Sequence, residues 1–201
     1  MAGVAAAIIA GGPARRLGGA AKPFLEVGGR AVADRQLEVL RPLFGRILAV
    51  AADPAPWHAR GLEVVADRVA GAGPLAGLSA ALTAVAAEAD AVVCVAGDLP
   101  FLSAALLAAV RDEAPAADAV APRPGGRAEP LCARYATRLR AAVDARLAEG
   151  KLALHELLAA SATVWLDEPA LARLDPGGNS FFNLNTPDDL RRAEEIARLR
   201  P

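Results

Sequence analysis

The chain has 201 residues, of which 54% are hydrophobic, and 22 basic against 23 acidic side chains give a formal net charge of -1. This balance excludes a bulk electrostatic attraction to nucleic acid or to an anionic membrane, so a polyanion would have to meet a local cluster of cations. No apolar stretch approaches the ~20 residues of a membrane span. No basic segment precedes the first apolar residues, as it does in a signal peptide. We therefore expect a cytoplasmic protein that binds neither membranes nor nucleic acid.

Short apolar runs alternate with helical patterns through the first two thirds of the chain. Continuous apolar character favours strands buried on both faces at 4–10, 46–52, 62–67, 91–98 and 117–123. The spacing of apolar residues favours helices at 31–44, 74–89 and 103–114. Pro74 suits the first turn of its helix, and Ser103 is a good N-cap. This alternation predicts an α/β fold with a single open, mostly parallel, Rossmann-like sheet, right-handed crossovers and helices on both faces.

The pattern changes after residue 123. The segment "EPLCARY" (129–135) could be an added strand, with an antiparallel direction as one option, and a short strand is expected at 163–167. Helices are expected near 136–149, 151–160 and 187–199. No repeat or linker divides the chain, so we expect one domain over 1–201, with a C-terminal elaboration of the same sheet. Cys94 and Cys132 have neither a paired nor a metal-like spacing, and we expect no structural disulfide.

A glycine-rich loop follows the first predicted strand, in "IIAGGPARRLGGAAKP" (8–23). It is not a Walker loop, because Pro23 follows the lysine, and it lacks the glycine spacing of a dinucleotide fingerprint. Its cations Arg15, Arg16 and Lys22 favour a loop laid over a triphosphate, where side-chain charge supplements backbone N–H groups. The alternative is a solvated turn with ordinary surface cations.

Two acidic residues follow other predicted strands. Asp98 in "AGDLP" (96–100) comes at the carboxyl end of its strand, where ligands sit in open α/β sheets. A carboxylate there can bind Mg²⁺, which takes one or two carboxylates together with substrate phosphates. The alternative is a helix cap or a turn residue, and Ser103 is the better suited cap. Asp67 precedes a glycine-rich loop and could accept hydrogen bonds from a base or ribose, or it could simply end its strand.

The loop and the two acidic segments, in this order, resemble the molybdenum cofactor guanylyltransferases, which have the nucleotidyltransferase fold of the sugar-nucleotide transferases. The resemblance is carried by "AGGPARRLGGAAK" (10–22), "VVAD" before "GPLAG" (64–77), "GDLP" (97–100) and "NLNTPDDL" (183–190), and it spans nearly the whole chain. The first motif marks the superfamily, and its combination with the last is more specific. The resemblance implies transfer of GMP from GTP to the terminal phosphate of molybdopterin-bound molybdenum, with release of pyrophosphate.

The resemblance also implies site residues in the nucleotide-binding half, 1–123. Arg16 and Lys22 would hold the triphosphate during catalysis, Asp67 would contact the nucleotide, and Asp98 would bind the nucleotide and the cofactor Mg²⁺. Backbone atoms near the guanine and ribose would come from Ile9, Ala10, Gly11 and Gly12. The attacking group is already an anionic phosphate, so this chemistry needs positioning and charge neutralisation and no general base.

The acceptor-binding half, 124–201, contains the second group of implied site residues. Asn183 and Asn185 would face the pterin substrate. Thr186, Pro187 and two aspartates also form a good helix start, which accounts for 186–189 and leaves the two asparagines unexplained. A labile product implies transient contact with the cofactor-insertion enzyme and with apo-molybdoenzymes as partners.

The chain departs from the family pattern at three places. Ala21 replaces an acidic residue before the loop lysine, "AVAADPAPW" (49–57) lacks a polar side chain common near the base, and Glu129 replaces a neutral residue. Three functions therefore stay open beside the guanylyltransferase. They are a cytidylyltransferase for the same acceptor, a nucleotidyltransferase for another phosphorylated small molecule, and a non-catalytic cofactor carrier. A Rossmann oxidoreductase is disfavoured by the glycine spacing.

Overall fold

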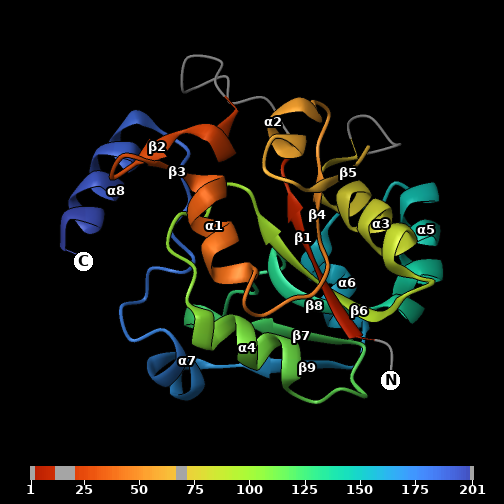
Figure 1. The fold of residues 1–201 in the computed structure, drawn as a ribbon. Coiled ribbons are helices and arrows are strands. Elements are labelled where there is room, and N and C mark those ends of the chain that lie inside the picture. The colour runs from red at the N-terminus through yellow and green to blue at the C-terminus, as the bar shows by residue number, and fades with distance from the viewer. Residues whose placement is uncertain (1–2, 12–20, 67–71, 200–201) are drawn as a thin grey trace.

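A seven-stranded sheet forms the centre of the protein (Figure 1). The structure is a computed structural model and describes residues 3–11, 21–66 and 72–199. The strand order is β5-β4-β1-β6-β8-β7-β9. The strands are β1 Gly3–Ile9, β4 Ile47–Val50, β5 Glu63–Val65, β6 Ala89–Ala96, β7 Ala119–Pro122, β8 Cys132–Ala136 and β9 Thr163–Leu166. Strand β8 runs antiparallel to both neighbours, and the other pairs are parallel.

Helices cover both faces of this sheet (Figure 1). On one face lie α3 Gly73–Val85, α5 Arg140–Ala148 and α6 Leu154–Ala160, and on the other α1 Val32–Leu40, α2 Ala55–His58, α4 Ala104–Asp112 and α7 Glu168–Leu174. Strand β1 contributes to both layers because its side chains alternate: Ala7 packs toward α3, and Ile8 packs toward α1. A Cβ on Gly77 would lie 2.8 Å from Cγ2 of Ile9, so glycine allows α3 to approach β1 closely.

A smaller third cluster connects the C-terminal helix to the rest of the fold. The hairpin of β2 Glu26–Val27 and β3 Arg30–Ala31 lies beside α8 Pro187–Leu199 (Figure 1). The buried residues of this third cluster are Val27, Val32, Phe101, Leu184 and Ala193. This cluster packs the segment before α8 against the chain that follows β6.

The predicted α/β architecture is confirmed, including the mostly parallel sheet and the helices on both faces. The added strand at β8 is antiparallel, Pro74 lies in the first turn of α3, and Ser103 Oγ accepts from the N–H of Leu106 at 3.3 Å. Cys94 and Cys132 are buried free thiols. The sequence analysis missed the β2–β3 hairpin, α2 and α7. No helix in the described part of the chain is long and apolar enough to cross a membrane.

Candidate active site

The carboxyl ends of β1 and β6 bring the two main predicted motifs together. Ile9 and Ala96 are partners at the ends of these paired strands. Just beyond them, the N–H of Gly97 donates to the carbonyl of Ile9 at 3.0 Å. The backbone of Ile9 and Ala10 therefore lies beside the turn that carries Asp98, at the edge of the sheet where open α/β folds bind ligands.

Three polar side chains from distant parts of the chain meet at this edge. Lys22 Nζ donates to Oδ2 of Asp98 at 2.8 Å and to Oδ1 of Asn185 at 2.6 Å. The side chains of Lys22 and Asp98 are 26% and 17% exposed, so both can reach a ligand. The cluster Lys22–Asp98–Asn185 thus offers one cation, one carboxylate and one amide at a single point.

The turn that carries Lys22 is held by packing on both sides. Lys22 begins the 3₁₀ turn η1 Lys22–Phe24, and the N–H of Phe24 donates to the carbonyl of Ala21 at 2.9 Å. Pro23 is buried against Gly97, where an added Cβ would lie 2.8 Å from its ring. The Phe24 ring lies 5.0 Å from the ring of Trp57 in α2. The proline-rich segment 49–57 therefore supports the lysine turn through an aromatic contact.

The segment before α8 reaches the same edge through its backbone. The N–H of Leu184, a fully buried residue, donates to the carbonyl of Asp98 at 3.1 Å. The N–H of Asp189 donates to Thr186 Oγ1 at 3.1 Å, and the Asp189 carboxylate accepts from the N–H groups of Asn185 and Thr186. These bonds form a reciprocal helix cap. The bond from the N–H of Asn185 is the main cause of a lowered pKa at Asp189.

The two predicted acceptor-side asparagines have different surroundings. Asn185 is exposed and accepts from Lys22, whereas the Asn183 amide donates to the carbonyl of Phe181 at 3.0 Å. Of the two asparagines, only Asn185 has a described contact with Lys22. The predictions for Gly12, Arg16 and Asp67 fall outside the described residues, and Gly11 is exposed at the end of the described part of the loop.

The sequence analysis missed one polar residue beside this site. Gln36 on α1 is 1% exposed, and its Nε2 donates to the carbonyls of Ala96 at 2.7 Å and Leu99 at 3.0 Å. A signal was present, because Gln36 occupies the apolar stripe of its helix with Ala33, Leu37 and Leu40. A polar residue in such a stripe needs a buried hydrogen-bond partner.

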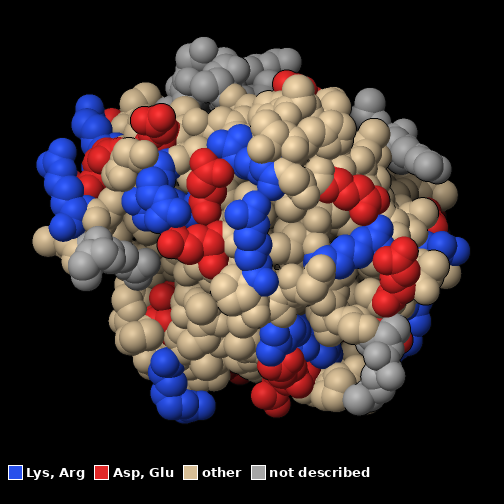
Figure 2. Space-filling view, in the orientation of Figure 1, with Lys and Arg blue, Asp and Glu red and all other residues tan. Residues whose placement is uncertain are grey.

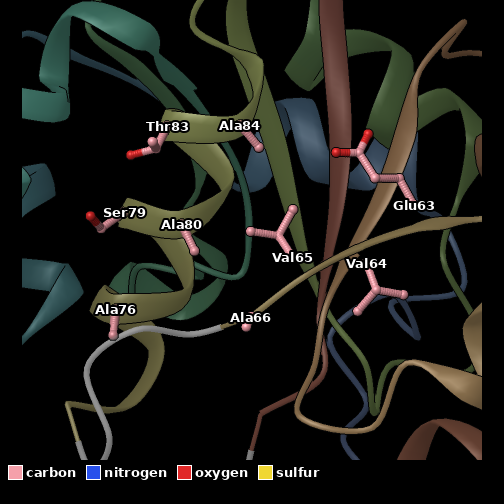
Figure 3. A pocket seen from close by; sticks show the side chains of 9 residues that line it. All are labelled: Glu63, Val64, Val65, Ala66, Ala76, Ser79, Ala80, Thr83 and Ala84. Carbon is pink, nitrogen blue, oxygen red and sulfur yellow. The ribbon is translucent and has the colours of Figure 1, made fainter.

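A recess of about 350 Å³ lies elsewhere, between β5 and α3 (Figure 3). Its described lining residues are mostly small or β-branched side chains of these two elements, and the one charged residue among them is Glu63. None of its lining residues belongs to the cluster Lys22–Asp98–Asn185. Among its described lining residues, the recess has a carboxylate and no cation, whereas the cluster Lys22–Asp98–Asn185 has both.

The surface around α1 carries interspersed charges of both signs (Figure 2). Ion pairs among the described residues include Arg60 with Asp34 and Arg46 with Glu63 and Glu88. The Arg60 hydrogen bond lowers the pKa of Asp34. Among the described residues on the face in view, the cations are interspersed with acidic side chains and do not form a continuous basic patch.

Comparison with known proteins identifies the family. The model of the MobA-like NTP transferase domain family matches residues 6–164. The chain belongs to this family. It is 34% identical over 191 residues to a "Probable molybdenum cofactor guanylyltransferase" of Pelotomaculum thermopropionicum, covering 94% of this chain and 91% of that one. It is 38% identical over 204 residues to the "Molybdenum cofactor guanylyltransferase" of Mesorhizobium japonicum, covering 96% and 95%.

Solved structures agree with membership of the MobA-like family. Molybdopterin-guanine dinucleotide biosynthesis protein A from Archaeoglobus fulgidus superposes with a TM-score of 0.82 at 29% identity, covering 97% of this chain and 99% of that one. The 2-C-methyl-D-erythritol 4-phosphate cytidylyltransferase of Thermus thermophilus has a TM-score of 0.66 at 22% identity, covering 96% and 98%. This second likeness shows the shared fold alone. The expected nucleotidyltransferase fold and family resemblance are both confirmed.

The donor set at Asp98 fits a cation that arrives with its substrate. Within the described ranges, no group of three or more His, Cys, Asp or Glu side chains could hold a metal ion. A single carboxylate beside a lysine is too small a donor set for a metal enclosed by protein. It suits Mg²⁺, a hard cation that keeps waters and shares substrate phosphates with one or two carboxylates.

Proposed function

We propose that this chain transfers GMP from GTP to the terminal phosphate of the molybdopterin cofactor and releases pyrophosphate. The observation that carries the proposal is the contact of Lys22 with both Asp98 and Asn185. It joins the loop after β1, the turn after β6 and the segment before α8. Relatives at 33–38% identity over nearly the whole chain are named for this activity.

In the proposed reaction, an oxygen of the acceptor phosphate forms a bond to the α-phosphorus of GTP. The bond from that phosphorus to the oxygen bridging to the β-phosphate breaks, and pyrophosphate leaves with the electron pair. The acceptor oxygen is already ionised, so no side chain needs to remove a proton. The protein has to align two anions and offset their charge, which positioned cations and hydrogen-bond donors can do.

The proposed roles combine the family resemblance with the chemistry of the side chains. Lys22 binds the triphosphate through ammonium donors that now engage Asp98 and Asn185. Arg16 adds charge from the loop, and Asp67 binds the nucleoside. Asn185 and Asn183 orient the acceptor. The nucleoside also meets backbone atoms of residues 9–12, of which Ile9 and Ala10 lie beside the Asp98 turn.

Asp98 is the residue proposed to hold Mg²⁺. Bound there with GTP, the ion would neutralise phosphate charge and make the α-phosphorus a better electrophile. Asp98 has a carboxylate oxygen, Oδ2, in contact with Lys22 at 2.8 Å, so a cation and the ammonium would share this carboxylate. We further propose that the chain works in the cytoplasm and passes its labile product to molybdoenzymes through transient contacts.

Pyrophosphate release tests the proposed function. The purified chain is incubated with each of the four ribonucleoside triphosphates, with and without molybdopterin cofactor, in Mg²⁺ and after chelation by EDTA. We expect release with GTP only, dependent on both the acceptor and the metal. Release with CTP in place of GTP would keep the mechanism and change the base preference to that of a cytidylyltransferase. Nucleotide binding without release under any condition would contradict the enzyme and favour a carrier.

A further inference from the structure

Gln36 is a buried polar side chain that the proposed chemistry does not use. It is 1% exposed and lies on the face of α1 that also buries Ala33, Leu37 and Leu40. An amide in such apolar surroundings is costly unless it is hydrogen-bonded. Nε2 of Gln36 donates to Ala96 and Leu99, at 2.7 and 3.0 Å. Both of its N–H donors are therefore engaged by backbone carbonyls of one short segment.

These two carbonyls stand on either side of Asp98. The N–H of Leu99 also donates to the carbonyl of Ala96 at 3.4 Å, which closes a four-residue turn with Asp98 in its third position. Only the NH₂ end of an amide can face two carbonyl oxygens, so the orientation of Gln36 is determined by its partners. Its Oε1 has no hydrogen-bond partner among the described atoms. The two hydrogen bonds that Nε2 donates thus account for an amide at this buried position.

The middle of the same turn is held from two other elements. The N–H of Gly97 donates to Ile9 at 3.0 Å, and the carbonyl of Asp98 accepts from Leu184 at 3.1 Å. Gln36 holds the two ends, from a third element. With the ends and the middle of the turn both fixed, the Asp98 side chain has a defined origin from which it reaches Lys22.

We infer that Gln36 is a positioning residue, which ties the turn Ala96–Leu99 to α1 and so fixes the Asp98 carboxylate for guanylyl transfer. The catalytic part of this inference rests on the proposed function, whereas the restraint on the turn does not. Small displacements of a group that aligns reacting atoms can slow an enzyme greatly even when substrate still binds. The loss of Gln36 donors should therefore lower kcat more than it raises KM.

The test compares Gln36→Met with Leu40→Ala. Methionine keeps the length of the side chain and removes both donors, and Leu40 is a buried residue of the same helix with no described bond to the turn. Steady-state pyrophosphate release gives kcat and the KM for GTP. Amide hydrogen exchange gives a second readout, the ratio of the exchange rate at Leu184 to that at Val93 in the buried strand β6.

We expect Gln36→Met to lower kcat by about 10-fold or more, as loss of groups that orient catalytic ligands does, with a KM for GTP close to that of the wild type. Its Leu184 amide should exchange faster relative to Val93, whereas Leu40→Ala should speed both amides together and keep kcat. A wild-type kcat with an unchanged exchange ratio in Gln36→Met would overturn the inference. Equal loss of kcat in the two variants would also overturn it.

The inference about Gln36 can be tested even if the proposed function fails or if Gln36→Met does not fold. If the wild-type chain releases no pyrophosphate with any nucleotide, the proposed function fails, and the exchange ratio alone decides whether Gln36 restrains the turn. If Gln36→Met does not fold, Gln36→Glu replaces it. A protonated carboxyl has the same shape and one O–H donor, so an intermediate exchange ratio supports the restraint and a wild-type ratio contradicts it.

Discussion

Leu184 donates its backbone N–H to the carbonyl of Asp98 at 3.1 Å, and its own side chain is fully buried. The bond links the segment before the C-terminal helix to the turn after the central strand β6. Because the neighbouring residue Asn185 carries the amide that Lys22 contacts, this backbone bond places that amide at the edge of the sheet. The C-terminal segment is thereby joined to the turn after β6 at the candidate site.

Replacement of Asp98 by alanine should abolish transfer and leave the fold intact. The side chain is partly exposed and the turn is held through its backbone. Removal of the carboxylate should therefore change the free energy of unfolding little. Loss of several kcal/mol of charge stabilisation corresponds to a fall in kcat of about 100-fold or more. Pyrophosphate release and thermal unfolding measure the two effects. Near-normal turnover would remove Asp98 from the mechanism, and Asp98→Asn tests whether shape without charge suffices.

Replacement of Lys22 by alanine should mainly weaken nucleotide binding. A hydrogen bond to a charged group contributes about 1.5–3 kcal/mol, so we expect the KM for GTP to rise about 10-fold to 100-fold. Lys151→Ala is the matched control, since this second lysine of the chain is exposed and pairs with Glu149. The control should keep the KM of the wild type. An unchanged KM and rate in Lys22→Ala would mean that the cation does not contact the triphosphate.

Replacement of Gly97 by alanine should disturb the contact between the lysine turn and the Asp98 turn. The new Cβ would lie 2.8 Å from Cγ of Pro23 and 3.4 Å from Cα of Ala10, and neither partner is a flexible side-chain end. We expect a loss of about 1–3 kcal/mol in the free energy of unfolding, typical of overpacking, together with lower activity. Gly45→Ala, with no atom within 4 Å of its Cβ position, should leave both unchanged. Urea unfolding of the two variants compares them directly.

The architecture was predictable because the buried parallel strands are continuous apolar runs. Strand β6 is an example, since seven of its eight residues are buried and its pattern fits no amphipathic helix. The β2–β3 hairpin was not predictable in the same way. Each of its strands has two residues, and it is held by the cluster around Leu184, which comes from the other end of the chain.

The location of the candidate site was predictable for the residues that follow the end of a strand. Lys22 and Asp98 follow β1 and β6, and these strands are neighbours, so their loops meet at one edge. The contact of Lys22 with Asn185 spans 163 residues and depends on how α8 packs, which no local pattern encodes. Gln36 gave only the signal of one polar residue in an apolar stripe, and its partners are backbone carbonyls that the sequence does not distinguish.

Replacement of Glu129 by glutamine should stabilise the protein at neutral pH. Burial raises the pKa of this carboxyl, and the nearby Arg127 offsets the effect only in part. An acid whose pKa is higher in the folded state contributes stability below its unfolded pKa of about 4.3, and this stability is lost as the pH rises through the folded pKa. Glu129→Gln removes that loss, so its Tm should exceed that of the wild type at pH values well above the folded pKa and equal it in acid.

The control variant is Glu149→Gln, in which the substituted carboxyl has a pKa lowered by Lys151, so no gain in Tm is expected. Thermal unfolding across a pH series measures both, and an equal Tm for Glu129→Gln and wild type at neutral pH would contradict the burial cost assigned to Glu129.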